Sequence, residues 1–70
     1  MLFDYSELLD LMEEKGITRR YICRKLDISY NTFSNKINGQ TYFTTLEMKI
    51  ISKILKIKKT DIGRYFLTEN

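Results

Sequence analysis

The segment GITRRYICRKLDISYNTFSNKING, residues 16–39, decides the fold of this chain. Thr18 has the side chain of a good helix N-cap, and Asp27 ends the helix because a short polar side chain tolerates a turn conformation. Only one residue separates Asp27 from Ser29, the next N-cap. A connection this short cannot close an antiparallel pair of helices, so we predict a steeply crossed helix-turn-helix at about residues 18–38.

The apolar spacing predicts which faces of these two helices are buried. On the first helix the inward residues are Ile22, Cys23 and Leu26. The second helix runs from Tyr30 to about Asn38, and Gly39 ends it because glycine readily adopts the left-handed backbone conformation. Its inner face carries Phe33 and Ile37, which are four positions apart.

One more helix is expected before this segment and two after it. Asp4 with Glu7, and Thr44 with Glu47, have the spacing of a capping box. Gly16 is suited to end the first of these helices, and Thr60 can cap the last. The stripes expected to be buried are Tyr5, Leu8, Leu9 and Met12, then Leu46, Ile50, Ile51, Ile54 and Leu55, then Ile62, Tyr65 and Phe66.

Together these elements predict an all-α fold, a compact bundle of about five short helices with a central helix-turn-helix. Residues 1–70 are expected to form a single domain, and residues 67–70 to fray. No apolar run is long enough to span a bilayer, so we expect a soluble, cytoplasmic protein with no membrane partner.

Composition and charge narrow the class of protein. The chain has 70 residues, no histidine and one cysteine, so we expect neither an internal disulfide nor a zinc site nor a roomy active-site cavity. The net charge of +3 divides into −5 for residues 1–14 and +8 for the remainder. This segregation predicts a basic face for a polyanion and an acidic face turned away from it.

The residues that catalysis could use do not assemble into a predicted active site. Cys23 lies on an apolar helix face with no histidine to activate it, so we interpret it as a packing residue. The carboxylates of the first helix are expected to be solvated, and a general acid needs desolvation. We therefore predict that the protein is not an enzyme and requires no cofactor or metal.

Several short motifs carry a resemblance to a known family. They are Gly16-Ile17-Thr18, Leu26-Asp27-Ile28-Ser29, Phe33-Ser34 and Asn38-Gly39 in the centre, and Phe3-Asp4-Tyr5-Ser6, Asp61-Ile62 and Tyr65-Phe66 at the flanks. With these motifs the chain resembles the lambda repressor and Cro family of helix-turn-helix proteins, in particular short phage-encoded Cro-like regulators. It departs from the family's pattern at Asp27, Cys23 and Lys36, where glycine, alanine and an apolar residue are usual.

The outer face of the second helix of the motif is rich in amides. Opposite Phe33 and Ile37 lie three asparagines, Asn31, Asn35 and Asn38, flanked by Thr32 and Ser34. Such residues are poor helix formers, which indicates that their side chains serve a purpose; asparagine can pair bidentately with adenine in the major groove. The resemblance implies base reading by four residues, for which a plain polar surface is the alternative: Tyr30, Asn31, Ser34 and Asn35.

Phosphate contacts are expected around the start of the first helix of the motif. Arg19 and Arg20 stand where the helix dipole disfavours a base, and a bound anion would remove that conflict. The resemblance implies that Arg19 touches the DNA backbone, whereas Arg20 has solubility as an alternative role. The predicted phosphate-contacting residues are Thr18, Arg19, Arg20, Ser29, Lys36, Asn38, Gln40, Thr41 and Tyr42.

A second group of cations, Lys49, Lys53 and Lys56, forms a stripe that could also indicate a helix on a membrane surface. We favour a solvated stripe on a helix whose other face enters the core. Lys56 then compensates the dipole at the helix C-terminus.

We therefore expect a sequence-specific regulator of transcription that binds double-stranded DNA, resembling a phage Cro-like repressor that occludes its operator at the nucleoid of a bacterial host. It is expected to bind as a homodimer, through exposed apolar residues near Tyr65, Phe66 and Leu67. The alternative is a protein-interaction module on the same fold, antirepressor-like or antitoxin-like, which binds a partner regulator protein.

Overall fold

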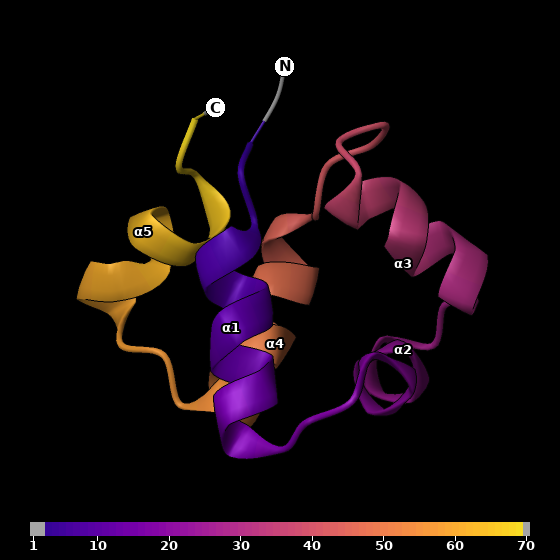
Figure 1. Ribbon diagram of the computed structural model, residues 1–70, viewed down its shortest axis with the longest axis horizontal. Coiled ribbons are helices and arrows are strands. Elements are labelled where there is room, and N and C mark those ends of the chain that lie inside the picture. Colours follow the sequence, from indigo (N-terminus) through magenta and orange to yellow (C-terminus); the bar gives the residue numbers. More distant parts are fainter. Residues whose placement is uncertain (1–2, 70) are drawn as a thin grey trace.

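The helix-turn-helix predicted for residues 18–38 is present in the computed structural model, which describes residues 3–69. Helices α2 (Arg19–Leu26) and α3 (Tyr30–Ile37) are joined through Asp27, whose φ of 58° lies in the left-handed region. In Figure 1, α2 is seen nearly end-on while α3 lies across the view. The two helices therefore cross steeply, as the short connection requires.

Both helices of the motif begin at the expected caps. The Tyr21 N–H donates to Thr18 Oγ1 over 3.1 Å at the start of α2. At the start of α3, the Thr32 N–H donates to Ser29 Oγ over 3.0 Å. Each bond satisfies a backbone donor that has no partner within its own helix.

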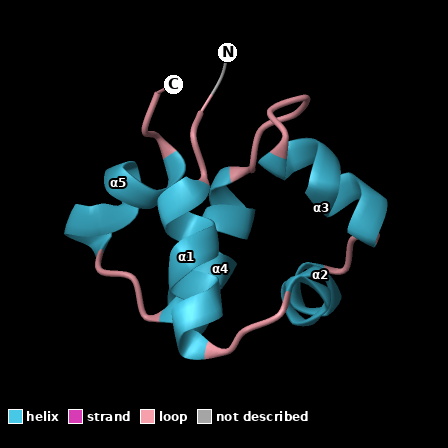
Figure 2. Cartoon of the chain, in the orientation of Figure 1, coloured by secondary structure: helices cyan, strands magenta, loops and turns pink. Residues whose placement is uncertain are grey.

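The other helical segments complete an all-helical bundle (Figure 2). They are α1 (Ser6–Lys15), α4 (Thr45–Leu55), the 3-10 turn η1 (Lys59–Asp61) and α5 (Ile62–Phe66). Figure 1 shows α1 crossing α4, with α5 on one flank and the helix-turn-helix on the other. The only β-type pairing within residues 3–69 is an isolated bridge between Phe3 and Glu69. The predicted all-α bundle of five short helices is confirmed.

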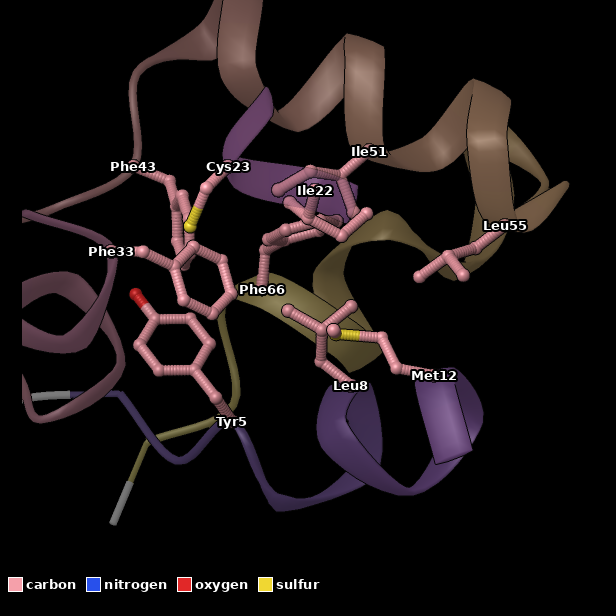
Figure 3. Packing of buried hydrophobic residues seen from close by; sticks show 10 residues of the cluster. All are labelled: Tyr5, Leu8, Met12, Ile22, Cys23, Phe33, Phe43, Ile51, Leu55 and Phe66. Atoms are coloured by element: carbon pink, nitrogen blue, oxygen red, sulfur yellow. The ribbon is translucent and has the colours of Figure 1, made fainter. Parts of the chain in front are cut away.

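Ten buried apolar side chains form one core between the helices (Figure 3). The ring of Phe43 makes an edge contact with Tyr5, at 5.3 Å between ring centroids. It makes two similar contacts, with Phe33 at 6.0 Å and with Phe66 at 5.8 Å. Edge-to-face pairs contribute about 0.5–1.5 kcal/mol each beyond the area they bury. Phe43 thus joins the N-terminal segment, α3 and α5 through one side chain.

A buried ion pair lies beside this core. Lys36 Nζ is 3.1 Å from Glu47 Oε1, and the two side chains are only 10% and 15% exposed. The same ammonium donates to the Tyr42 carbonyl over 3.0 Å and lies 5.9 Å from the ring centroid of Phe43. Lys36, which we predicted as a phosphate contact, is therefore turned inward, whereas Ile37 is only half-buried. The carboxylate makes this possible, because it compensates a charge that is otherwise costly to bury.

The start of α1 differs from the capping box expected of Asp4 and Glu7. The helix begins at Ser6, and the Asp4 carboxylate accepts bonds from the Ser6 hydroxyl at 2.5 Å and the Ser6 N–H at 2.9 Å. These bonds, the hydroxyl bond first, hold the pKa of Asp4 below its ordinary value. Glu7 instead pairs with Arg64 of α5, with Oε1 2.6 Å from Nε. A partner distant in the sequence took the carboxylate that the local pattern assigned to the cap.

The end of the chain also differs from the prediction. Thr60 caps no helix, because it lies inside η1 and neither η1 nor α5 has a side-chain cap. The Asp4 N–H donates to the Thr68 carbonyl over 2.7 Å. Residues 67–69, which we expected to fray, are therefore tied to the N-terminal segment; position 70 lies outside the described residues.

Helix α4 turns a narrower face to the core than predicted. Its buried residues are Ile51, Ser52 and Leu55. At about 100° per residue, Leu46 lies about 140° around the helix from Ile51, and it is 66% exposed. Ile50 and Ile54 are half-buried at the edges of the stripe. The capping box of Thr44 and Glu47 is formed as predicted.

We expect Phe43→Ala to destabilise the fold by about 3–5 kcal/mol, since it removes a large buried ring and its three aromatic contacts. That is comparable with the whole stability of a small domain, about 5 kcal/mol. The exposed Leu46 supplies the matched control, and Leu46→Ala should change stability by no more than about 0.5 kcal/mol. Urea denaturation followed by circular dichroism measures both; equal midpoints for the two variants would contradict the central role of Phe43.

The two ion pairs should contribute unequally to the free energy of unfolding, measured by the same urea denaturation. Glu47→Gln leaves the Lys36 ammonium buried without its counter-charge, so we expect a loss of about 1.5–3 kcal/mol. Glu7→Gln disrupts a pair whose side chains are 61% and 46% exposed, and solvent already weakens it. Its unfolding midpoint should stay close to that of the parent chain. A larger effect at Glu7 than at Glu47 would refute this ranking.

Candidate nucleic-acid interface

Three of the four predicted base-reading residues, Asn31, Ser34 and Asn35, lie on the outer face of α3, and Tyr30 lies at its edge. Phe33 and Lys36 anchor the helix on its opposite side, where both are buried. At about 100° per residue, Asn31 points almost directly away from the midpoint of these two anchors. Figure 1 shows α3 at the rim of the bundle, away from α1. The set comprises two exposed residues, Tyr30 and Asn31, and two half-buried ones, Ser34 and Asn35.

Four exposed cations lie on α2, and we call them the α2 cation cluster: Arg19, Arg20, Arg24 and Lys25. Within residues 3–69, the ion pairs are those of Lys36 and Arg64, so no member of the cluster is neutralised there by a carboxylate. The Arg20 guanidinium lies 5.6 Å from the ring centroid of Tyr30. Stacking on a ring leaves the guanidinium N–H groups available to an anion. This contact places a cation beside the first turn of α3.

Sequence reasoning missed half of this cluster. It selected Arg19 and Arg20 from their place at the helix N-terminus and passed over Arg24 and Lys25. The signal for the latter two was the charge count, because Asp27 is the only acid between Lys15 and Gln40. The Lys25 ammonium lies 5.4 Å from the ring centroid of Tyr21, a second exposed cation on an exposed aromatic ring.

Two predicted phosphate contacts, Thr18 and Ser29, serve as helix caps. The Ser29 hydroxyl also donates to Thr32 Oγ1 over 2.8 Å, so it is occupied as donor and acceptor inside α3. Thr18 Oγ1 acts only as an acceptor among the bonds formed by the described residues. Of the two, Thr18 has the hydroxyl proton free for an outside oxygen.

The loop after α3 carries the remaining predicted phosphate contacts, all of them exposed: Asn38, Gln40, Thr41 and Tyr42. Gly39, with φ of 86°, turns the chain in a conformation that other residues rarely adopt. The Gln40 N–H donates to the Asn35 carbonyl over 2.9 Å, and the Tyr42 ring packs edge-on against Phe3 at 5.7 Å. The loop is therefore held close to the end of α3.

The lysine stripe of α4 is exposed at Lys49, Lys53 and Lys56. The opposite face of the helix is covered by the core through Ile51 and Leu55. An amphipathic helix needs its apolar face free to enter a membrane surface, and this face is already occupied. Lys56 lies at the C-cap, where its charge compensates the helix dipole.

Three further features of residues 3–69 concern the cysteine, metal binding and membrane spanning. Cys23 is buried in the core, as expected of a packing residue, and burial raises the pKa of its thiol. Over residues 3–69, no three side chains of His, Cys, Asp or Glu gather where they could hold a metal ion. None of the helices in that range has the length and apolar character needed to cross a bilayer.

Comparison with known proteins assigns the chain to a family. A search among curated proteins found none that matches the chain. The model of a family described as "Protein of unknown function (DUF739)" matches residues 1–69. Because this match includes the helix-turn-helix, the core and both flanks, the chain belongs to the DUF739 family.

Proposed function

We propose that this chain is a sequence-specific regulator of transcription that binds double-stranded DNA, in the manner of a phage Cro-like repressor that occludes its operator. One observation carries the proposal: the α2 cation cluster has no carboxylate partner within residues 3–69, and it reaches the polar residues of α3 through Arg20, whose guanidinium lies over the ring of Tyr30. Hydrogen-bonding side chains for base edges next to unneutralised positive charge suit a nucleic acid.

The dimensions of α3 support this proposal. An α-helix with its side chains is about 10–12 Å in diameter, so the major groove of DNA, which is about 12 Å wide, can admit α3. Asn31, which points away from the core, is the residue best placed to pair bidentately with adenine. Ser34 and Asn35 follow one turn later and are placed for neighbouring base edges.

The distribution of charge also supports a defined orientation on DNA. Phosphates attract the α2 cation cluster and repel the exposed acids of α1, such as Glu14. Arg19 lines one hollow with Asp10 and Glu13, so it lies where these two regions meet. Contacts from cations to phosphates supply affinity for any sequence, whereas contacts from α3 to bases supply discrimination. The two helices of the motif therefore have separate roles in the proposed complex.

Two copies are proposed on each operator, because one α3 contacts only a few base pairs. Of the apolar residues expected at the dimer contact, Phe66 is fully buried in the core. Leu67, which is 47% exposed, and the half-buried Tyr65 remain for that role.

Selection of bound duplexes from a random library should recover sites with two-fold symmetry. The half-sites should be about 34 Å apart, one turn of the double helix, so that both copies bind one face of the DNA. Sedimentation of the complex measures the stoichiometry, and we expect two protein chains per duplex. Sites without symmetry, occupied by a single chain, would exclude the dimeric arrangement.

A protein-interaction module on the same fold is the alternative function, in which a partner could cover the exposed Leu46 and Leu67. The two functions are separated by measuring binding to DNA upstream of the chain's own operon, with and without the products of neighbouring genes. Binding of the chain alone supports the regulator. Binding only to a neighbouring gene product, and to no DNA, supports the module.

Replacement of Asn31 and replacement of Arg19 should affect DNA binding in different ways. Asn31→Ala is expected to cost about 1–3 kcal/mol on the selected duplex and little on a random one, because only a base contact is lost. Arg19→Ala should weaken binding to both duplexes alike. It should also make the slope of log K against log salt shallower by roughly one, because one phosphate contact is lost. Mobility-shift titrations of both variants on both duplexes over a salt series measure these affinities and the slope.

A charge-matched control accompanies these variants. Lys53→Ala removes one exposed cation from α4, outside the proposed interface, and should leave the salt slope unchanged. Circular dichroism should find all three variants folded, because each side chain is exposed. Equal losses on both duplexes for Asn31→Ala would contradict base reading, and a salt slope unchanged in Arg19→Ala would remove its phosphate contact.

A further inference from the structure

We infer that Lys36 is a positioning residue: its buried bonds fix the rotation of α3 and hold the loop 38–43, and thereby present the outer face of α3 to its partner. The consequence for DNA binding rests on the proposed function, whereas the consequence for the loop does not. This role replaces the phosphate contact that the sequence predicted for Lys36.

The geometry of the ammonium carries the inference. Lys36 leaves the last turn of α3 and reaches two other segments, with Nζ 3.0 Å from the Tyr42 carbonyl and 3.1 Å from Glu47 Oε1. The same carboxylate oxygen accepts the Thr44 N–H over 2.9 Å and so belongs to the capping box of α4. One lysine therefore links α3, the loop and the start of α4.

The loop depends on this link because both of its ends are bound to α3. Near its start, the Gln40 N–H donates to the Asn35 carbonyl over 2.9 Å. Near its end, the Tyr42 carbonyl accepts from Lys36, and the Tyr42 ring packs against Phe3. Without the ammonium, the hydrogen bond from α3 to the end of the loop is lost, whereas the packing of Phe43 on Phe33 remains.

The rotation of α3 depends on Lys36 for a second reason. Phe33 is the only fully buried apolar residue of this eight-residue helix, and Ile37 is half-buried. A single apolar anchor is non-directional and tolerates rolling of the helix about its axis. Lys36, one turn later, supplies a second anchor with directional bonds. A roll of the helix would move Asn31 away from the direction in which it now points.

The positioning role and the phosphate role predict different effects of replacing Lys36 on the salt dependence of DNA binding. A lysine that contacts phosphate releases a counterion, so its loss lowers the slope of log K against log salt by roughly one. A lysine already neutralised by Glu47 releases none, so its loss should leave the slope unchanged while discrimination between duplexes falls. Lys36→Met removes the charge and keeps an unbranched apolar chain, and Lys53→Met is the matched change at an exposed lysine of α4.

The first measurement uses the chain alone. Amide hydrogen exchange should become at least about fivefold faster in Lys36→Met at Gln40 and Thr44, whose N–H groups are bonded at the two ends of the loop. Exchange at Ile22, in the core helix α2, should change by less than about twofold, and Lys53→Met should leave all three sites unchanged. Lys36→Arg, which can renew the ion pair, should restore part of the protection.

The second measurement uses the duplex selected from the random library and a random duplex of the same length. Lys36→Met should lower the ratio of the two affinities about tenfold with an unchanged salt slope, and Lys53→Met should alter neither. A salt slope shallower by one in Lys36→Met would overturn the positioning role. Amide exchange rates at the loop equal to those of the parent chain would overturn it as well. If the parent chain bound no duplex, the proposed function would fail, and the exchange measurement would still decide whether Lys36 holds the loop.

Discussion

The edge-to-face contacts of Phe43 are the interaction on which the rest of this structure depends. In so small a chain few side chains are fully buried, and Phe43 touches Tyr5, Phe33 and Phe66, which come from three separate segments. Figure 3 shows these rings among the ten core residues. Because Phe43 follows α3 and precedes α4, its position also sets where the loop between them must run. The packing of the core therefore also determines the path of the loop beside the candidate interface.

The ion pair of Lys36 and Glu47 extends this core toward the surface. An apolar residue at position 36 would give area without direction, whereas an ammonium with two acceptors fixes an orientation. The inner side of α3 is thereby settled by Phe33 and Lys36, and its outer side is left to polar residues that form helix poorly, among them Asn31. Such a conflict between local propensity and structure is expected at functional surfaces rather than in scaffolds.

Local patterns predicted the helices well wherever the partners lie within one turn of each other. The caps at Thr18 and Ser29 and the capping box of Thr44 with Glu47 all formed, because each needs only a side chain and a backbone N–H three positions apart. The same rule failed at Asp4, where the Ser6 hydroxyl supplied a nearer donor and Arg64, far away in the sequence, took the carboxylate of Glu7. In the same way, nothing near Thr68 in the sequence announces its bond to Asp4.

By itself, the sequence determined the number and kind of elements, the steep crossing at Asp27, the segregation of charge, and the side of α3 that carries Asn31. These features depend on helical periodicity, on backbone conformations that residue types favour, and on composition, none of which requires a partner distant in the sequence. Only the tertiary structure decided that Lys36 is buried and that Leu46 is exposed. The reason is that the free energy of burying a side chain depends on the partners that meet it, and a partner such as Glu47 is brought close only by folding.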